Sequence, residues 1–221
     1  MTDMAPDDLR SHPRGERRLT AKGRATRDRI VDAAADLVVV RGVAGLSLDE
    51  VLEVTGTSKS QLYHYFDDRS DLVRAVIARH GERILGPHGA VLASAPGWEA
   101  LAAWRDLVVE TTELAGCHGG CPVGSLANEL VELDPAARHD LIVVFDDWTG
   151  LLAGTLRRMV EVGELDEDAP VDDLALATIA SLQGGSLLAK TTLTTRPVEV
   201  ALDTALAHVR SYATVAPVGE E

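Results

Sequence analysis

The sequence contains few aromatic residues and few cysteines. Tyrosine, phenylalanine and tryptophan number three, two and three in a chain of 221 residues. The only cysteines, Cys117 and Cys121, are too few for a disulfide-stapled scaffold. The start of the chain, MTDMAPDDLR, is acidic and has no apolar run, so it does not resemble a signal peptide. These absences argue against a small secreted protein held together by disulfides.

Long apolar runs and strand patterns are missing as well. No segment approaches the roughly 18 apolar residues that a membrane-spanning helix needs. Alternating strand patterns and internal repeats are absent, whereas Ala and Leu are plentiful. The chain also lacks a Gly-rich phosphate loop and a clear nucleophile-base constellation, which argues against an enzyme. We therefore expect an all-α, soluble, cytoplasmic protein with no catalytic site, no cofactor and no membrane partner.

Negative charge dominates, but it is unevenly distributed. The formal net charge is −14, yet residues 1–85 carry 14 Lys/Arg and 14 Asp/Glu, while residues 86–221 carry 7 and 21. Eight of the basic residues lie within residues 10–29. This asymmetry indicates a front that faces a polyanion and an acidic rear. A solvated, disordered tail would explain residues 1–20 equally well.

Apolar residues recur at helical spacing between candidate caps and prolines. The expected N-caps are Thr26, Ser47, Ser58, Ser70 and Asp134, with Glu50 completing a capping box at Ser47. The expected stops are Gly42, Gly56 and Gly163. Further helices are expected over residues 98–115, 135–162, 171–190 and 198–213. Pro87 and Pro122 are expected to lie between helices, because proline lacks the N–H that a helix interior needs.

The stretch TGTSKSQLYHYFDDRSDL, residues 55–72, joins two short helices through Gly56 and fits a helix-turn-helix. Leu62 and Phe66 share one face and are expected to pack against the preceding helix. The other face offers donors, acceptors and aromatic rings that suit base edges and phosphates. These side chains are Lys59, Ser60, Gln61, Tyr63 and His64. A solvated short helix whose tyrosines cover a core edge is the alternative.

Residues 26–84 resemble the N-terminal domain of the TetR family of bacterial repressors. The resemblance rests on TRDRIVDAAADLVVVRG, on SLDEVLEVTGTSKSQLYHYFDDRSDL and on the helix that follows. The family typically has lysine where this chain has Arg69. The resemblance implies that Ser47 contacts phosphate and that Thr57, Lys59, Ser60, Gln61, Tyr63 and His64 face double-stranded DNA. It further implies that Tyr65 and Arg69 lie near the DNA backbone.

The same resemblance implies three parts: a flexible basic arm (1–22), a DNA-binding domain (23–84) and a ligand-binding and dimerisation domain (85–215). The arm would lie along phosphates or in a minor groove. The segment GCHGGCPVGSLANEL also resembles the LmrA/YxaF-like branch of the family. The implied function is a homodimeric repressor that a small apolar or aromatic effector releases from its operator.

The last two helices are the expected dimer surface, because small residues allow close helix approach; packing within one chain is the alternative. These small residues are Ala177, Ala180, Ser181, Gly184 and Gly185. The effector is expected near the central helices, where aromatic faces and one amide converge. The expected ligand-binding residues are Trp104, Cys121, Phe145, Trp148 and Gln183. The aromatic residues are equally compatible with a simple core.

Cys117, His118 and Cys121 supply three candidate ligands where a structural zinc site needs four, so we expect no metal. Two free thiols in a Gly-rich loop are the simplest interpretation of these cysteines. A thiol-dependent redox sensor or enzyme that uses Cys117 and Cys121 is one alternative function for the chain. A helical interaction module without a DNA role is another.

Overall fold

The computed structural model describes residues 19–214 of the chain, and all of the regular elements within that range are helices. The predicted all-α class is therefore confirmed. The nine helices are α1 (Ala21–Arg41), α2 (Leu48–Thr55), α3 (Lys59–Tyr65), α4 (Arg69–Ser94), α5 (Gly97–Leu114), α6 (Pro122–Leu130), α7 (Pro135–Glu161), α8 (Val171–Thr192) and α9 (Arg196–Arg210).

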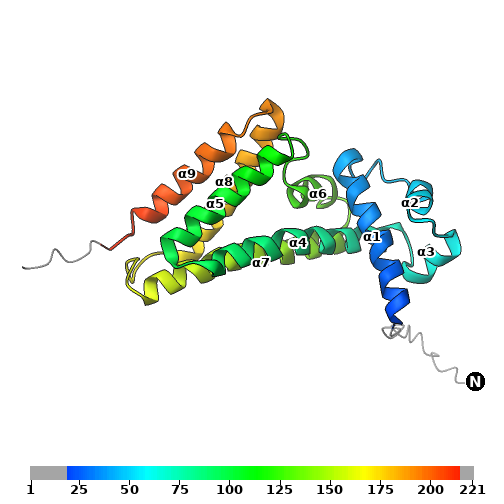
Figure 1. Cartoon of the computed structure of the whole chain (residues 1–221), viewed down its shortest axis with the longest axis horizontal. Helices are drawn as coiled ribbons and strands as arrows, with labels where there is room; N and C mark the ends of the chain where they lie inside the picture. The colour runs from blue at the N-terminus through cyan, green and yellow to red at the C-terminus, as the bar shows by residue number, and fades with distance from the viewer. Residues whose placement is uncertain (1–18, 215–221) are drawn as a thin grey trace, which may run out of the picture.

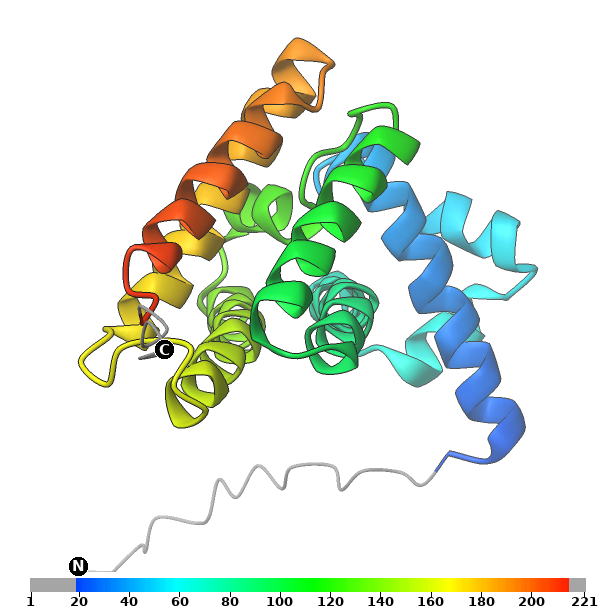
Figure 2. The ribbon, with the colours of Figure 1, turned by 60° about the vertical axis from the view of Figure 1, so that its left-hand side comes forward.

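The helices form two lobes that share a long central pair. Helices α1, α2 and α3 make one end of the molecule, while α5, α8 and α9 gather at the other end (Figure 1). The long helices α4 and α7 run side by side along the length between them. Figure 2 shows α8 and α9 stacked along the outer edge of the larger lobe. Because α4 reaches both lobes, it connects the two ends mechanically.

Several predicted caps are present with the expected geometry. Ser47 Oγ accepts the N–H of Glu50 at 3.4 Å, and Asp134 Oδ1 accepts the N–H groups of two residues in the first turn of α7. Pro135 occupies the first helical position of α7, where its missing N–H costs nothing. The Glu50 side chain does not close the expected box at Ser47; it pairs with Arg41 instead.

Two predicted helix starts were wrong. Helix α1 begins at Ala21 with Thr20 as its N-cap, so Thr26 lies inside it and its hydroxyl donates to the Lys22 carbonyl. Helix α4 begins at Arg69 with Asp68 as its N-cap. Ser70, the predicted cap, donates its hydroxyl to Asp134 Oδ2 at 2.5 Å. In both places a second capping residue nearby in sequence supplied the cap.

Two prolines also lie elsewhere than predicted. Pro87 lies inside α4, which continues for seven residues beyond it, and Pro122 begins the unpredicted helix α6. The predicted boundary between residues 84 and 85 therefore falls inside a continuous helix. Residues 1–18 of the predicted basic arm lie outside the described residues, and Ala21 and Lys22 already belong to α1.

The core has two clusters that meet along α4 and α7. One cluster unites α1 with the small helices and the first half of α4, through residues such as Ile30, Leu62 and Phe66. The other unites α5, α7, α8 and α9, through residues such as Trp104 and Leu152. Ile84 packs against both clusters. A displacement of α4 in one lobe would therefore disturb the side-chain packing of the other lobe.

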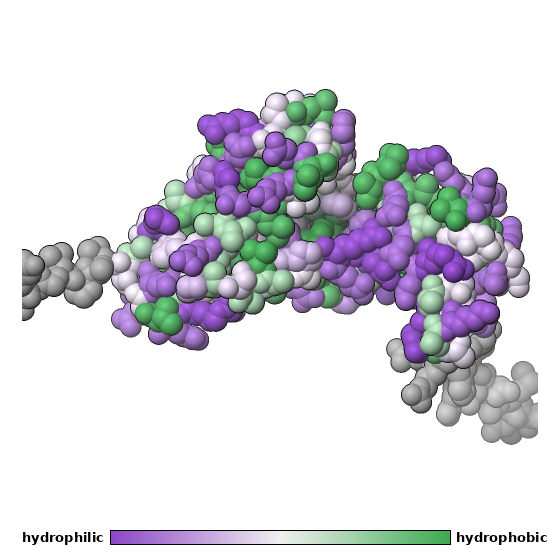
Figure 3. All heavy atoms as spheres, viewed as in Figure 1, coloured by the Kyte–Doolittle hydropathy of each residue, from purple (hydrophilic) through white to green (hydrophobic). Residues whose placement is uncertain are grey.

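No helix in the described residues is long and apolar enough to cross a membrane. On the face drawn in Figure 3, hydrophilic and hydrophobic residues are interspersed without a continuous apolar band.

Candidate DNA-binding surface and ligand cavity

A rigid turn positions helix α3. Gly56 adopts a left-handed conformation with φ of 62°, which glycine tolerates best, and its N–H bonds the end of α2. Thr55 and Thr57 share a hydrogen bond of 2.6 Å between their hydroxyls. Thr57 is only 8% exposed, so its side chain lies inside the turn. This burial argues against the implied contact between the Thr57 side chain and DNA. The side chain instead stabilises the turn through its hydrogen bond with Thr55.

Helix α3 buries one face and exposes the other. Leu62 and Phe66 are each 1% exposed, and the Arg27 guanidinium lies 5.2 Å from the centre of the Phe66 ring. The opposite face carries the exposed side chains predicted from the sequence: Lys59, Ser60, Gln61, Tyr63 and His64. The helix therefore presents a continuous polar and aromatic surface to solvent, as an element that enters a DNA groove must.

The N-terminus of α3 has a complete capping box, which engages Gln61. Ser58 Oγ accepts the Gln61 N–H at 3.2 Å, and Gln61 Oε1 accepts the Ser58 N–H at 2.8 Å. A bidentate contact to adenine needs both the oxygen and the amino group of the amide. Gln61 can therefore offer its amino group to DNA, but it must break the box to offer its oxygen as well.

The residues expected near the DNA backbone differ in how far contacts within the protein already engage their side chains. Ser47 is exposed at the N-terminus of α2, where N–H groups favour an anion. Tyr65 is half-buried and meets the His64 ring edge-on, with ring centres 5.0 Å apart. Arg69 donates a hydrogen bond to the Val43 carbonyl, so part of its guanidinium supports the turn between α1 and α2.

Ion pairs and hydrogen bonds tie this DNA-facing lobe to the rest of the chain. Along α1 and α4, Asp28, Asp32 and Asp36 pair with Arg79 and Arg83 at 2.7–3.1 Å. This ladder holds α1 against α4.

The second tie comes from helix α6. Glu129 Oε2 accepts the N–H groups of Val43 and Ala44 at 2.8 and 3.3 Å, in the turn after α1. Arg74 on α4 pairs with Asp140 on α7 at 2.7 Å. Helices α4 and α6 therefore hold the DNA-facing lobe directly, and α7 is tied to it through α4.

A cavity of about 260 Å³ lies where both lobes meet. Its wall combines α1, α4, α5, α7 and α8 with the loop before α6. The lining residues are Val39, Ile84, His88, Val108, Thr111, Thr112, Ala115, Cys117, His118, Gly119, Gly120, Cys121, Pro122, Trp148, Leu182 and Ser186. No Lys, Arg, Asp or Glu of the described chain is among them. The cavity therefore suits a small uncharged molecule.

The predicted ligand residues divide over this cavity and a neighbouring one. Cys121 and Trp148 line the first cavity. Phe145 and Gln183 line the second, of about 360 Å³, which Cys121 also borders. Trp104 is 0% exposed and stands behind the wall of the first. The five residues are thus neighbours, but they do not form one binding surface.

The sequence analysis missed His88, which both indoles contact. Trp104 Nε1 and Trp148 Nε1 donate to His88 Nδ1 at 2.8 and 3.1 Å. Burial lowers the pKa of His88 to about 4. Pro87 was expected to lie between helices, and His88 follows it directly in the sequence. The contact of this histidine with two tryptophans could be found only from the structure, in which α4 continues past Pro87.

Gln183 has the unsatisfied amide expected from its place in an apolar helix. Its Nε2 is buried and has no hydrogen-bond partner among the described residues. A ligand or water in the second cavity would supply that partner.

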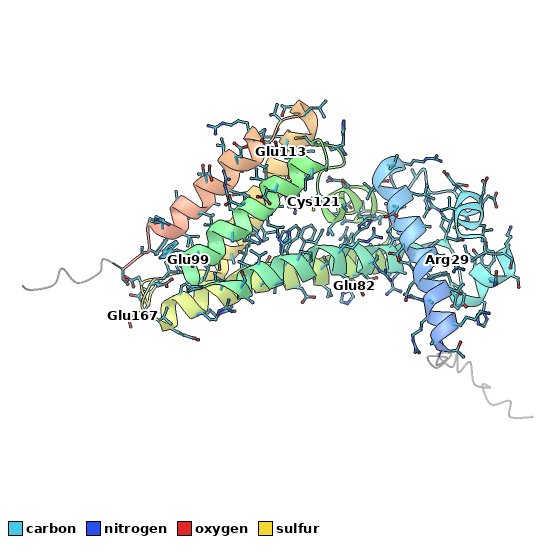
Figure 4. The ribbon with its side chains drawn as sticks, in the orientation of Figure 1. Arg29, Glu82, Glu99, Glu113, Cys121 and Glu167 are labelled. Atoms are coloured by element: carbon cyan, nitrogen blue, oxygen red, sulfur yellow. The ribbon has the colours of Figure 1, made fainter. Side chains whose placement is uncertain are left out.

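The cysteines show little sign of thiol chemistry in this conformation. Cys121 Sγ caps α6 by accepting the Gly124 N–H at 3.4 Å, and Figure 4 labels it in the loop between α5 and α6. Burial raises the pKa of the Cys121 thiol, which disfavours the nucleophilic thiolate. Cys117 is 7% exposed. No group of three potential metal ligands lies close enough to hold an ion within residues 19–214.

Two family models match the chain. Residues 30–76 match the model described as "Bacterial regulatory proteins, tetR family". Residues 97–205 match the model described as "Tetracyclin repressor-like, C-terminal domain".

Individual proteins are similar over most of the chain. An HTH-type transcriptional regulator in the lacX 3′ region of Lactococcus lactis is 31% identical over 76% of this chain and 85% of its own length. Transcriptional regulator AcuR of Cereibacter sphaeroides is 27% identical over 89% of this chain and 91% of its own. The crystal structure of a TetR transcriptional regulator from Chloroflexus aurantiacus superposes with a TM-score of 0.79 at 27% identity, covering 89% of this chain and 100% of that one.

Two further relatives bear on finer predictions. The transcriptional repressor DhaR of a Mycobacterium species is 24% identical over 74% of this chain and 82% of its own. YxaF of Bacillus subtilis is 23% identical over 78% of this chain and 88% of its own. The YxaF similarity supports the family, and the LmrA/YxaF-like branch stays a prediction.

Proposed function

The chain belongs to the TetR family of DNA-binding transcriptional regulators, and from that premise we propose that it is a homodimeric repressor released from its operator by a small, uncharged, mostly apolar effector. The family consists of regulators and not of enzymes, which removes the enzymatic alternative. The observation that carries the proposal is the composition of the cavity wall. Val39 of the DNA-facing lobe lines the same cavity as Trp148 and Leu182 of the rear lobe.

A molecule in this cavity touches both lobes at once, so its binding is sensitive to their relative placement. An effector releases DNA only if it binds better to the conformer whose α3 helices are misplaced for the groove. Two structural routes can transmit that preference. Helix α4 carries His88 in the cavity wall and Arg79 against α1. Helix α6 begins at the cavity with Pro122 and ends near Glu129, which holds the turn after α1.

The DNA side of the proposal uses Ser47 and Lys59 for phosphates and the exposed face of α3 for the groove. Ser60, Tyr63 and His64 would meet base edges, with the amino group of Gln61 as a further donor. Tyr65 and the remaining N–H groups of Arg69 would lie near the backbone. The Thr57 side chain is not part of this set, because it is buried.

The dimer side of the proposal rests on an exposed stripe along α8 and α9. Ala177, Ala180 and Gly184 are exposed, as are the large side chains of Leu187 and Leu188. Gly185 differs: a Cβ there would lie 2.8 Å from the Val198 Cα, so its small size serves packing within the chain. A four-helix contact between two copies would cover the exposed stripe.

The proposal is tested by selecting genomic DNA fragments with the purified protein, then measuring affinity for the selected sequence by fluorescence anisotropy. We expect one preferred, two-fold symmetric sequence and a loss of affinity when an effector is added. Binding that is equally tight for all sequences, or that no small molecule from a broad uncharged panel weakens, would contradict the proposal.

A further inference from the structure

His88 has a fixed tautomer because two tryptophans donate to the same ring nitrogen. An indole N–H is a donor only. Trp104 Nε1 and Trp148 Nε1 both lie within hydrogen-bond distance of Nδ1, at 2.8 and 3.1 Å. A ring nitrogen that accepts these bonds cannot itself carry a proton. The proton of neutral His88 must therefore be on Nε2.

The other ring nitrogen is available to the cavity. Among the described residues, the hydrogen bonds of His88 are those to its Nδ1, and its Nε2 is not one of the buried atoms left without a partner. His88 is part of the cavity wall, next to Trp148. Helices α5 and α7 thus hold the Nδ1 side of the ring, and the Nε2–H side remains for a ligand.

Among the other polar side chains of the wall, His118 is exposed to solvent, and the two threonines are poorer donors. The hydroxyls of Thr111 and Thr112 donate to the carbonyls of Leu107 and Val108 at 2.7 and 2.8 Å, so they face a ligand only as acceptors. The wall has no Lys or Arg to balance an anionic ligand. A molecule that gains most from this surface is therefore uncharged and presents an oxygen acceptor to His88.

We propose that His88 is the specificity-determining donor of the cavity, and that its Nε2–H bonds the carbonyl oxygen of an uncharged, mostly apolar effector. Trp104 and Trp148 act as positioning residues that keep this nitrogen protonated. The inference rests on the proposed function in one respect, namely that the cavity of about 260 Å³ is the effector site.

The tautomer can be tested without any ligand. In protein with ¹⁵N-labelled histidine, NMR at pH 7 should find His88 entirely as the Nε2–H form. The double variant Trp104→Phe, Trp148→Phe keeps aromatic bulk but removes both donors, and it should show a mixture of tautomers. Trp98→Phe is the matched control, since Trp98 lies against Arg210 and not His88. An Nδ1–H or charged His88 in the unmodified protein would overturn the proposal.

The ligand class is tested with three probes of similar size: acetophenone, α-methylstyrene, which replaces the carbonyl oxygen by carbon, and benzoate, which is charged. By calorimetry, acetophenone should bind about 5- to 10-fold more tightly than α-methylstyrene, the value of one hydrogen bond, and benzoate should bind most weakly. In His88→Phe the preference for acetophenone should fall to about twofold or less. Equal binding of the first two probes, tightest binding of benzoate, or binding of none contradicts the proposed ligand class.

Release of DNA is measured separately, so that the two proposals fail differently. If acetophenone binds in a His88-dependent way but neither it nor any molecule of the broad uncharged panel weakens the DNA complex, the inference about His88 stands and the release function fails. If an uncharged molecule releases DNA equally well from the unmodified protein and from His88→Phe, the function stands and the donor role is refuted.

Discussion

At the scale of single residues, Lys59 is an exposed cation in the first turn of α3, on the face that would meet DNA. Lys59→Ala should weaken binding to all sequences and reduce the slope of log affinity against log salt by about 1, because one phosphate contact and its counterion release are lost. Fluorescence anisotropy at several salt concentrations measures this slope. Arg69→Ala is a less direct test, since Arg69 also supports Val43.

Two variants serve as controls for Lys59. Arg196→Ala removes an exposed cation from α9, far from α3, and should leave the salt slope unchanged. His64→Ala should change the preferred base at one position and preserve the slope. A Lys59→Ala slope equal to that of the unmodified protein would remove this residue from the phosphate contacts.

His88 should make the fold sensitive to acid. Burial lowers its pKa from 6.5 to about 4, so the unfolded chain takes up a proton first as the pH falls. The resulting loss of folding stability is absent above about pH 6.5. It increases as the pH falls to about 4, by roughly 1.4 kcal/mol for each pH unit. Urea unfolding of the unmodified protein and His88→Asn at pH 7 and pH 5 measures it. The variant should lose less stability between the two pH values.

The exposed His139 provides the comparison for this measurement. His139→Asn should follow the pH dependence of the unmodified protein. Equal loss in the unmodified protein and in His88→Asn would mean that another group, such as His80, controls the acid response. Burial also lowers the pKa of His80, with Arg83 as a further cause.

Sequence reasoning at this scale found aromatic side chains near the cavity but not their arrangement. Trp148 and Cys121 line it, whereas Trp104 lies behind His88 and contacts it through one hydrogen bond and an edge-on ring contact. Helical periodicity indicates which residues are buried, but it does not distinguish a cavity wall from the layer behind it. That distinction depends on how α4, α5 and α7 are placed against one another.

At the scale of elements, α3 depends strongly on its N-terminal cap because it has only seven residues. Ser58→Ala removes the hydroxyl that accepts the Gln61 N–H. The free energy of unfolding should fall by about 1 kcal/mol. Ser60→Ala, on the exposed face of the same helix, should change it by less than about 0.5 kcal/mol. Urea unfolding at pH 7 compares the two; equal effects would show that the box contributes nothing.

Helix boundaries were predictable where one residue alone could supply the cap. Asp134 before Pro135 and Gly56 after α2 are of this kind, and both were confirmed. Where two candidates competed, as Ser70 with Asp68, local sequence could not decide, since the outcome depends on tertiary contacts such as the bond from Ser70 to Asp134. Pro87 is tolerated within α4 because packing against α5 and α7 outweighs a missing hydrogen bond.

At the scale of the whole molecule, the proposed dimer would double the few base contacts that a seven-residue α3 can make. Leu188→Glu places a charge on the exposed stripe of α8, where Leu188 is 56% exposed. Burying that charge against a second copy is costly, so the variant should be monomeric at micromolar concentration and lose operator binding. Light scattering coupled to size exclusion gives the mass.

Leu133→Glu is the matched control for the dimer. Leu133 is 80% exposed and lies after α6, away from α8 and α9. This variant should keep the mass and operator affinity of the unmodified protein. Preferred operators should contain half-sites separated by about one helical turn of DNA or somewhat more, ~34–36 Å or above. A monomeric unmodified protein that binds its operator tightly would contradict the dimer.

The ladder between α1 and α4 also restricts how these helices can move. Its aspartates, Asp28, Asp32 and Asp36, recur every four residues, as do Arg79 and Arg83. Each guanidinium lies between two carboxylates, Arg79 between Asp28 and Asp32 and Arg83 between Asp32 and Asp36. Sliding one helix along the other by half a turn, about 3 Å, would leave each guanidinium opposite a single carboxylate. The ladder therefore favours the register in which α1 and α4 lie. A displacement of α4 that keeps these pairs moves α1 as well, and this connects the cavity wall at His88 to the lobe that carries α3.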